Sequence, residues 1–481
     1  MPVGVTIKTR RGTAAEWSAA NPTLAAGEPG YETDTGILKY GDGVTAYNSL
    51  PARVPTSQKT TRSATIVIAA SNSSAKSKAQ ADYVCDGIAD NEEIMAAINA
   101  LPTAGGCVTL MEGTYQLADR IYPTTKKTNM WLIGYGAKLV APSTTVNYPI
   151  NFHSTYKHDS IHIRGIEIDG NGTSTGGIRI SASNSDVIDC YVHNVAAGVG
   201  MFVWSESGIL SNVTLENNRI VGTPTTMTYG IQTAGTVEDI KISKNRIENT
   251  MFNGIAAYGG PTTEIAQNII ISGNRVINTG HSAIAASPSS YGIISNNIIS
   301  DIPYADEAGI EIEYKLSHGT DTSHHYTIVG NVVYNCNWGI ATHNRDDEVV
   351  KDPHDITIIG NTVSDCTVGI NLLYGNGIVV SGNNLEGNAT QIMKGAGVDA
   401  KIYGNTGYVT ENTGTATITA TTTTVEVTHG LAAAPTRVLL SPTTATGGKD
   451  FYVSAKGATT FTITIDSAAD ADISFDWQAV I

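Results

Sequence analysis

The chain has 481 residues, of which only 15% are charged, and its 44 acidic against 29 basic side chains give a formal net charge of −15. This balance argues against nucleic acid or an anionic membrane as a partner, because both attract positive surfaces. The five cysteines are odd in number and widely spaced, which argues against a disulfide framework.

The N-terminus carries no basic-then-apolar signal, and no run of about 18 apolar residues occurs anywhere. We therefore expect a soluble protein that is made in the cytoplasm of the producing cell and does not insert into a membrane.

Residues 1–52 form the first predicted unit. It opens with Arg10-Arg11-Gly12-Thr13, continues with Gly27-Glu28-Pro29-Gly30-Tyr31-Glu32-Thr33-Asp34 and closes with Lys39-Tyr40-Gly41-Asp42-Gly43. These motifs, in this order, resemble the small N-terminal domain of bacteriophage tail fibres, tailspikes and tropism determinants. The resemblance implies attachment to a phage tail or baseplate, and hence a place in the virion tail and action outside the cell. The alternative is a general surface adaptor module.

Residues 53–80 are rich in Ser, Thr and Lys and are predicted to be a neck or linker with one strand at 64–70. A helix is expected over 90–101, with Asp90 as its N-cap, Glu93 three residues later and one apolar face. The sequence around this helix resembles the entry of pectate-lyase-like β-helices, in which a short helix covers the open end of the coil.

A repeated phrase, apolar-x-apolar-x-x-Asn-x-apolar, dominates the middle of the chain at intervals of 22 to 34 residues. The repeated asparagines are Asn218, Asn245, Asn274, Asn297, Asn331, Asn361, Asn383 and Asn405. A second phrase, Gly-Ile or close to it, falls between them. Such periods indicate a stacked array, and the two-residue alternation of Ile and Val indicates short strands.

This repeat predicts a parallel β-helix over residues 81–411. Asparagine suits each corner because it tolerates left-handed backbone and its amide can bond its equivalents above and below. The family resemblance implies that the coil is right-handed, and it leaves activity open, since lyases, hydrolases and binding proteins share the fold.

Residues 412–481 are Thr-rich and contain six alternating strand segments separated by turns. They predict a small β-sandwich that resembles C-terminal domains of phage tail proteins. The resemblance implies a role in trimer closure or glycan contact. The predicted fold class is therefore all-β: an attachment domain, a β-helix and a β-sandwich.

Aligning the coils on Gly-Ile predicts which side chains point outward, because strand residues alternate between faces. Glu311 and Glu313 then point outward from one coil and His343 from the next, about 4.8 Å away. These two coils are also the longest. We predict Glu311, Glu313 and His343 as catalytic residues. The predicted substrate-binding residues are Trp204, Tyr229, Tyr258, Tyr314, Arg345, Asp346 and Asp347.

Two carboxylates at i and i+2 on a strand are roughly 6.6 Å apart at the backbone, near the separation of about 6.5–9.5 Å in inverting glycosidases. The structural alternative is a solvated charged face neutralised by Lys315 and Arg345. A polysaccharide lyase would instead use the basic residues of the same patch. His318, His324 and His325 could bind a metal, but they lie on a polar loop and are interpreted as surface histidines.

The favoured function is therefore a phage tailspike that binds and hydrolyses a host surface polysaccharide. The open alternatives are a polysaccharide lyase on the same scaffold and a receptor-binding fibre without catalysis. The family resemblance implies a homotrimer. No metal and no other cofactor is expected.

Overall fold

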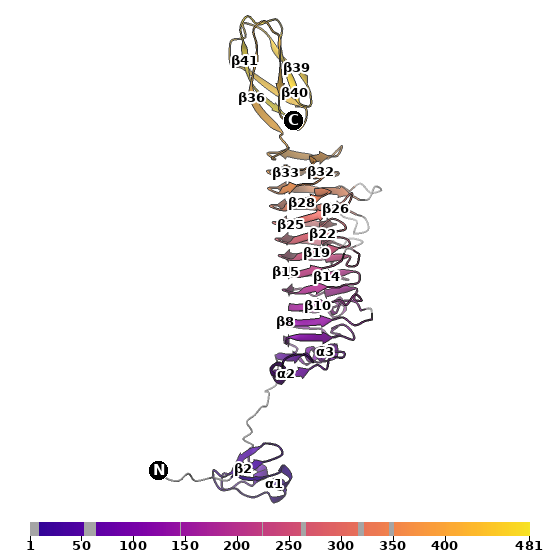
Figure 1. The fold of residues 1–481 in the computed structure, drawn as a ribbon, viewed down its shortest axis with the longest axis vertical. Helices are drawn as coiled ribbons and strands as arrows, with labels where there is room; N and C mark the ends of the chain where they lie inside the picture. The colour runs from indigo at the N-terminus through magenta and orange to yellow at the C-terminus, as the bar shows by residue number, and fades with distance from the viewer. Residues whose placement is uncertain are drawn as a thin grey trace, which may run out of the picture. The chain divides into compact units, whose positions relative to one another are not determined.

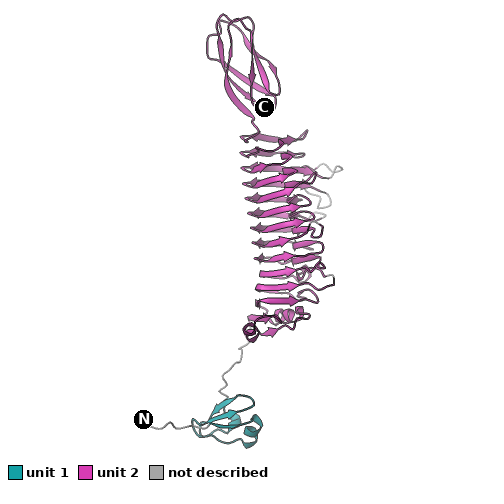
Figure 2. Cartoon of the chain, in the orientation of Figure 1, with its two compact units in different colours: residues 1–63 teal, residues 64–481 magenta. Residues whose placement is uncertain are grey.

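The computed structural model describes residues 9–51, 64–144, 146–223, 225–260, 266–315, 322–345 and 351–481. It divides into two compact units, residues 1–63 and 64–481 (Figures 1 and 2). The second unit consists mainly of short strands, as predicted. Among the described residues, no helix has the length and apolar character needed to cross a bilayer.

The N-terminal unit packs around Trp17, which stacks on Tyr47 with ring centroids 4.1 Å apart. Its helix starts in a capping box, in which Thr13 and Glu16 bond each other's backbone N–H. Gly41 lies where a Cβ would come 2.3 Å from the carbonyl oxygen of Ala25. The elements are β1 (Arg10–Gly12), α1 (Ala14–Ala20), β2 (Pro29–Glu32), β3 (Leu38–Tyr40) and η1 (Tyr47–Ser49).

The second unit starts earlier than the predicted boundary at residue 81. The strand expected in the neck is β4, and it pairs in parallel with β6, so residues from 65 onward belong to the coil stack. The elements of this entry are β4 (Thr65–Ala69), α2 (Ala75–Gln80), β5 (Tyr83–Val84), α3 (Asn91–Ala100), β6 (Gly106–Leu110), β7 (Gly113–Gln116), β8 (Thr128–Val140), β10 (Asp159–Asp169) and η2 (Ser154–Tyr156).

Helix α3 buries Ile94, Ala97 and Ile98 as predicted, and Asp90 is its N-cap residue. The carboxylate of Asp90 makes no capping hydrogen bond, however. It accepts hydrogen bonds from the backbone N–H groups of Gly87 and Gln116 instead.

The coils form a parallel β-helix, in which every strand pairs with its equivalent one coil away. One sheet consists of β9 (Ile150–Phe152), β11 (Gly176–Ile180), β14 (Val199–Trp204), β17 (Tyr229–Ala234), β20 (Ile255–Tyr258), β23 (Ile284–Ser287), β26 (Ala308–Tyr314), β29 (Trp338–Asn344), β32 (Val368–Leu372) and β34 (Thr390–Lys394).

The other strands stack beside this sheet (Figure 1) and lie before or after one corner of each coil, which is occupied by Cys190 in one coil and by the repeated asparagine from Asn218 onward. Those before it are β12 (Ser185–Ile188), β15 (Leu210–Glu216), β18 (Val237–Ser243), β21 (Ala266–Ser272), β24 (Ser289–Ser295), β27 (His324–Val329), β30 (His354–Ile359), β33 (Ile378–Ser381) and β35 (Ala400–Tyr403). Those after it are β13 (Tyr191–His193), β16 (Arg219–Val221), β19 (Arg246–Thr250), β22 (Arg275–Thr279), β25 (Ile298–Ile302), β28 (Val332–Cys336) and β31 (Thr362–Ser364).

The repeated asparagines form a buried hydrogen-bonded ladder. The Oδ1 of Asn274 accepts from the backbone N–H and the Nδ2 of Asn245, and its own Nδ2 donates to Asn297 and to the carbonyl of Ile242. The ladder is thus as predicted, but the left-handed residue is not the asparagine itself. It is the residue before it, such as Lys244 or Gly273, since this residue turns the chain so that the amide points into the stack.

The Gly-Ile phrase has a steric cause. A Cβ at Gly339 would lie 2.2 Å from Cγ1 of Val363 and 2.4 Å from the carbonyl oxygen of Gly369 on the next coil. Only glycine allows this approach. The following isoleucine enters the core, as Ile310 and Ile340 do.

The C-terminal segment is the predicted β-sandwich. Two antiparallel sheets of three strands, β36-β41-β38 and β37-β40-β39, share a core that contains Phe461, Phe475 and Trp477. The strands are β36 (Glu411–Ile418), β37 (Thr424–Thr428), β38 (Arg437–Pro442), β39 (Phe451–Lys456), β40 (Thr460–Ile465) and β41 (Ile473–Val480).

Candidate active site

Strands β26 and β29 pair in the predicted register. Glu313 lies opposite His343, and Glu311 lies opposite Ala341. Both glutamates face away from the apolar core, which takes Ile310 and Ile312. They are nevertheless 1% and 3% exposed, so the solvated charged face that the sequence left open is wrong. The guanidinium of Arg345 lies against both of them.

Arg345 joins three carboxylates. Its Nε lies 3.0 Å from Oε1 of Glu311 and 2.6 Å from Oε2 of Glu313, and its Nη2 lies 2.6 Å from Oε2 of Glu311. Nη1 and Nη2 also contact Glu307 at 3.3 and 3.0 Å. Arg345 therefore compensates the charge of three buried acids at once.

The two predicted catalytic carboxylates are closer than the backbone spacing suggested. Both have an oxygen on the same Nε, so these oxygens cannot be further apart than the sum of 3.0 and 2.6 Å. This ceiling applies to one pair of oxygens, and it is closer to the roughly 5–5.5 Å between the carboxyl groups of retaining glycosidases than to the 6.5–9.5 Å of inverting ones. The shared guanidinium of Arg345 draws the two side chains together.

Opposite shifts separate the pKa values of the two acids. Burial by itself raises the pKa of Glu311, but the hydrogen bond from His343 at 2.9 Å and the charge of Arg345 outweigh it and lower the pKa to about 2. Burial and the charge of Glu311 raise the pKa of Glu313 to about 8, against the effects of Arg345 and Lys315. These opposite directions favour one proton on the pair at neutral pH, carried by Glu313 rather than by Glu311.

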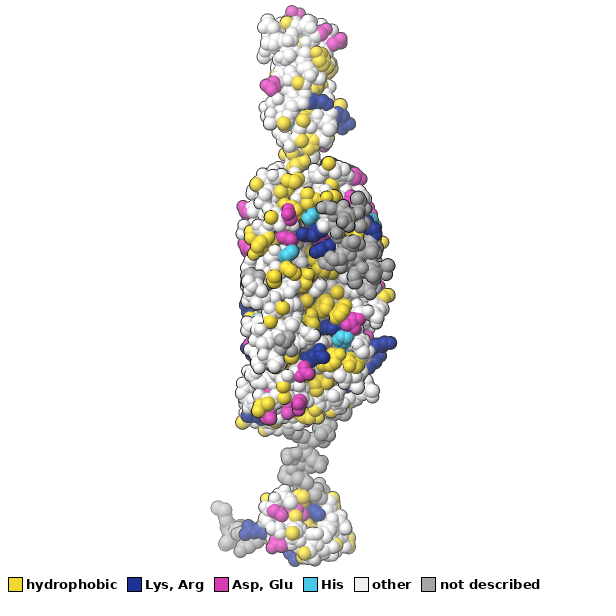
Figure 3. All heavy atoms as spheres, turned by 90° about the vertical axis from the view of Figure 1, so that its right-hand side faces the viewer, with side chains coloured by type: hydrophobic (Ala, Val, Ile, Leu, Met, Phe, Trp, Pro, Cys, Tyr) yellow, Lys and Arg dark blue, Asp and Glu magenta, His cyan; other side chains and the backbone are white. Residues whose placement is uncertain are grey.

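A cavity of about 150 Å³ opens beside these acids. Its lining combines carboxylates, cations and aromatic rings: Tyr229, Phe252, Asn253, Tyr258, His281, Glu307, Glu311, Glu313, Lys315 and Arg345. The rings of Tyr229 and Tyr258 meet edge to face at 6.1 Å. Charged and histidine side chains gather in two places on the face of the β-helix seen in Figure 3.

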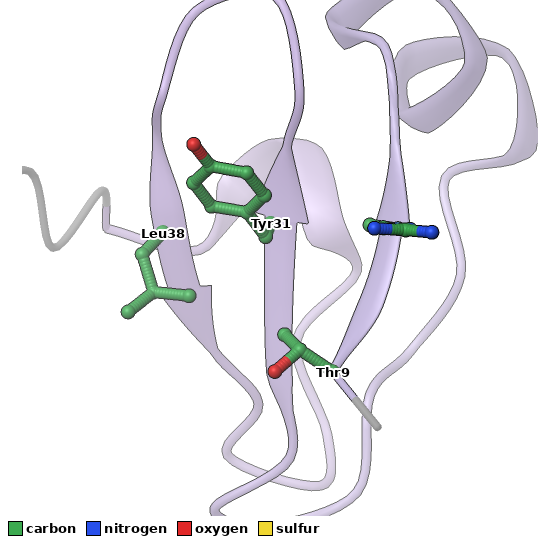
Figure 4. A pocket seen from close by; sticks show the side chains of 4 residues that line it. Thr9, Tyr31 and Leu38 are labelled. Atoms are coloured by element: carbon green, nitrogen blue, oxygen red, sulfur yellow. The ribbon is translucent and has the colours of Figure 1, made fainter.

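Larger hollows lie elsewhere. One of about 530 Å³ is on the N-terminal unit, lined by Thr9, Arg11, Tyr31 and Leu38 (Figure 4). This described lining has no carboxylate or imidazole and hence no acid–base pair. The volume of a cavity therefore does not identify the active site of this protein. The smaller cavity beside the acids is the candidate active site because it contains the acid–base groups.

The structure brings together only part of the predicted substrate-binding set. Tyr229, Tyr258 and Arg345 meet in the cavity. Tyr314 is fully buried, which corrects the expectation that it contacts substrate. It has the opposite parity to Glu313 along β26, so alternation turns it inward with Ile312.

Trp204 lies at the end of β14, four strands from β26 in the same sheet, with the guanidinium of Arg179 4.0 Å from its ring centroid. It is therefore remote from the acids. Asp346, Asp347 and His318 lie outside the described residues.

The sequence did not point to several residues around these acids. The hydroxyl oxygen of Ser282 lies 2.5 Å from Glu311 and 2.9 Å from Glu307 and has one proton for the two carboxylates, and His281 lies 3.1 Å from Glu307. Asn253 accepts a hydrogen bond from the hydroxyl of Tyr258. All of them precede the Gly-Ile phrase of their coil by one to three residues. Reading each coil upstream of that phrase, as well as downstream, would have found them.

No metal-binding group coincides with this cavity among the described residues. The two sets of His, Cys, Asp and Glu side chains that could hold an ion are His325 with His354 and Asp355, and Cys85 with Asp90 and Glu93.

Three family models match parts of the chain. Residues 7–45 match the major tropism determinant N-terminal domain, residues 227–351 the right-handed β-helix region, and residues 309–429 the periplasmic copper-binding protein NosD. No curated protein matches the chain. The protein thus carries a tropism-determinant-type N-terminal domain ahead of a right-handed β-helix.

Solved structures of similar fold include the A-module of mannuronan C-5 epimerase AlgE6 from Azotobacter vinelandii, at 16% identity over 66% of this chain and 96% of that one, with a TM-score of 0.49. Another is the tailspike protein gp49 of Pseudomonas phage LKA1, at 12% identity over 80% of this chain and 91% of that one, with a TM-score of 0.48. A third is an exopolygalacturonase of Thermotoga maritima, at 12% identity over 66% of this chain and 87% of that one, with a TM-score of 0.48. Likeness at this level carries no conclusion about activity.

Proposed function

We propose that the protein is a bacteriophage tail protein that binds a host surface polysaccharide and cleaves it by glycoside hydrolysis. The match of residues 7–45 to a tropism determinant domain supports attachment to the phage tail. A homotrimeric assembly, which the family resemblance implies, is part of the same proposal, and sedimentation of the purified protein tests it.

The observation that carries the catalytic proposal is the pair of buried acids with opposite pKa shifts. Pairs of carboxyl groups whose environments separate their pKa values are how glycosidases assign acid and base roles. Protonated Glu313 is the general acid that donates to the leaving glycosidic oxygen. Ionised Glu311 attacks the anomeric carbon through an oxocarbenium-like transition state as the glycosidic bond breaks, and a water deprotonated by Glu313 then hydrolyses the glycosyl–Glu311 ester.

Arg345, His343 and Ser282 act as positioning residues for Glu311. Their hydrogen bonds hold its carboxylate ionised and fixed in place. The ceiling on the acid separation is compatible with the roughly 5–5.5 Å of retaining enzymes, in which the second carboxylate attacks the sugar. We therefore favour retention of configuration.

A lyase has less support from the same geometry. It needs a cation to neutralise a uronate carboxylate, but all three guanidinium nitrogens of Arg345 already contact glutamates, which leaves Lys315 as the other lining cation for this role. The phenol of Tyr258 is also a poor base, since burial raises its pKa well above the usual value. A binding protein without catalysis is favoured by one observation, the near-complete burial of both acids.

The test is incubation with host capsule or wall polysaccharide while reducing ends and ultraviolet absorbance are followed together. Hydrolysis releases reducing ends without the absorbance of an unsaturated product, whereas elimination gives both. Glu313→Gln should stop cleavage and leave binding intact. Glu248→Gln, on strand β19 of the other sheet, is the control. A polysaccharide that is bound but releases no reducing ends would leave only the binding function.

A further inference from the structure

Histidines gather with one aspartate where strands β27 and β30 begin. His324 pairs in register with His354 on the next coil, and their rings stack with centroids 4.9 Å apart. His325 and Asp355 follow them at the corner, and both have left-handed backbone. The parallel register thus brings side chains from two successive coils to one place.

The left-handed corner does not by itself identify the role of these residues. In earlier coils the same position is held by Asn212, Asp239, Asn268 and Tyr291, and asparagine, aspartate and histidine all favour this conformation. Asn268 donates from its amide to Asp239 on the preceding coil at 3.2 Å. The case for an ion therefore rests on the convergence of donor atoms from the two coils.

The spacing of the donor atoms fits a metal ion. One donor atom from each of His325, His354 and Asp355 lies within 4.8 Å of the others. Oδ2 of Asp355 is 2.8 Å from Nδ1 of His354 and 3.8 Å from Nε2 of His325. Two ligands at about 2.0–2.1 Å from a tetrahedral ion are roughly 3.3 Å apart, which lies between these distances.

We propose that His325 Nε2, His354 Nδ1 and the Asp355 carboxylate bind one divalent transition-metal ion of the zinc type. Imidazole nitrogens with one carboxylate are a common donor set for zinc. The side chains of His325 and Asp355 are 46% and 53% exposed, so an ion reaches them from solvent.

His324 is a positioning residue for this site. Its Nδ1 lies 2.7 Å from Nδ1 of His325, the ring nitrogen that does not face Asp355. A hydrogen bond there orients the ligand ring, as outer-shell partners of metal-bound histidines do. Tyr291 stacks on the same ring, with centroids 4.8 Å apart.

The ion joins two coils close to the acid pocket without taking part in its chemistry. Ser323, directly before the cluster, donates its hydroxyl to the backbone carbonyl of Glu313 at 2.7 Å. A bound metal therefore anchors the segment that supports β26. This inference does not depend on glycan cleavage.

The experiment uses full-length protein without a histidine tag, stripped with a chelator and titrated with Zn²⁺ against a chromophoric competitor. We expect one zinc per chain, and Co²⁺ in its place should show the visible absorption of a tetrahedral site. His354→Ala should abolish stoichiometric binding. His324→Ala should weaken it by about 10–100-fold.

The matched control is His193→Ala, which removes a histidine that lies 3.1 Å from Glu167. Zinc should raise the melting temperature of the wild type and of this control, but not of His354→Ala. Should His354→Ala fail to fold, Asp355→Asn gives the same comparison. Equal zinc binding by the wild type and a folded ligand variant, or no stoichiometric binding by the wild type, would overturn the site.

Discussion

Glu313 keeps its proton at neutral pH because its neighbour two residues away has the stronger partners. His343, Ser282 and Arg345 all hydrogen-bond Glu311, and the resulting fixed negative charge makes a second ionisation unfavourable. Arg345 touches both acids, so its charge alone does not decide which one ionises. The difference between the pKa values of Glu311 and Glu313 therefore comes from the hydrogen bonds that Ser282 and His343 make to Glu311.

Cleavage should follow the ionisation of Glu313. Its pKa is raised to about 8, so the proportion of the general acid that carries its proton falls as the pH rises through that value. Activity should be level across weakly acid and neutral pH and decline above about pH 8. Initial rates of reducing-end release at constant ionic strength measure this. Activity that rises above pH 8 would exclude Glu313 as the acid.

The ionisation of Glu313 should also make the free energy of unfolding fall as the pH rises. The folded pKa of Glu313 lies above its ordinary value of 4.5, so its contribution is full below pH 4.5 and is lost as the pH rises through about 8. Glu313→Gln lacks this loss. Its melting temperature should therefore gain on that of the wild type between about pH 5 and pH 9, whereas Glu248→Gln should follow the wild type throughout.

Arg345→Met should destabilise the protein strongly, because it leaves three buried carboxyl groups without their cation. Removing one partner of a buried ion pair costs about 3–5 kcal/mol in the free energy of unfolding. The loss should shrink toward acid pH, where the acids take up protons instead. Guanidinium unfolding at two pH values measures both effects. Arg246→Gln, which removes an exposed ion pair with Glu248, should change little.

At the scale of the element, the asparagine ladder is the main polar support of the coil stack. Asn274→Ala removes an acceptor from two groups of Asn245 and leaves its backbone N–H buried without that partner. We expect a loss of about 2–4 kcal/mol in the free energy of unfolding. Asn268→Gly, at an exposed left-handed corner, keeps the backbone conformation and should cost far less. Equal losses would mean that the ladder adds nothing beyond its turn.

Local patterns predicted most of these elements. The Gly-Ile phrase predicted the core-facing isoleucines and the register of Glu313 against His343. Alternation of apolar residues predicted the six C-terminal strands. Each of these features depends on residues that are close in the sequence. The same alternation along the strand also places Tyr314 on the face of Ile312, so its burial was predictable from the sequence.

Other features were not local. The distance between the two acids depends on Arg345, 32 residues after Glu313, and the partners of Asp90 come from a turn and a strand on either side of it. Sequence spacing gives a backbone separation, whereas a shared guanidinium sets the side-chain separation.

At the scale of the whole molecule, the chain divides into two compact units, and the proposed attachment and glycan-processing functions are assigned to different ones. A chain of residues 64–481 should fold and keep the polysaccharide activity of the full-length protein, while it should fail to join phage tails. Circular dichroism, the cleavage assay and incorporation into particles test these points. Loss of cleavage in a folded truncated chain would show that the N-terminal unit takes part in the site.

Because the strands of each coil pair with those of the adjacent coils and the ladder asparagines occupy equivalent positions, the β-helix should tolerate being cut and rejoined at these corners. Two related genes that recombine at this codon should encode a chain whose coils still stack in register. Under the proposed function, exchange of the coil pair that bears the acids would change the polysaccharide that is recognised and leave the N-terminal unit unchanged.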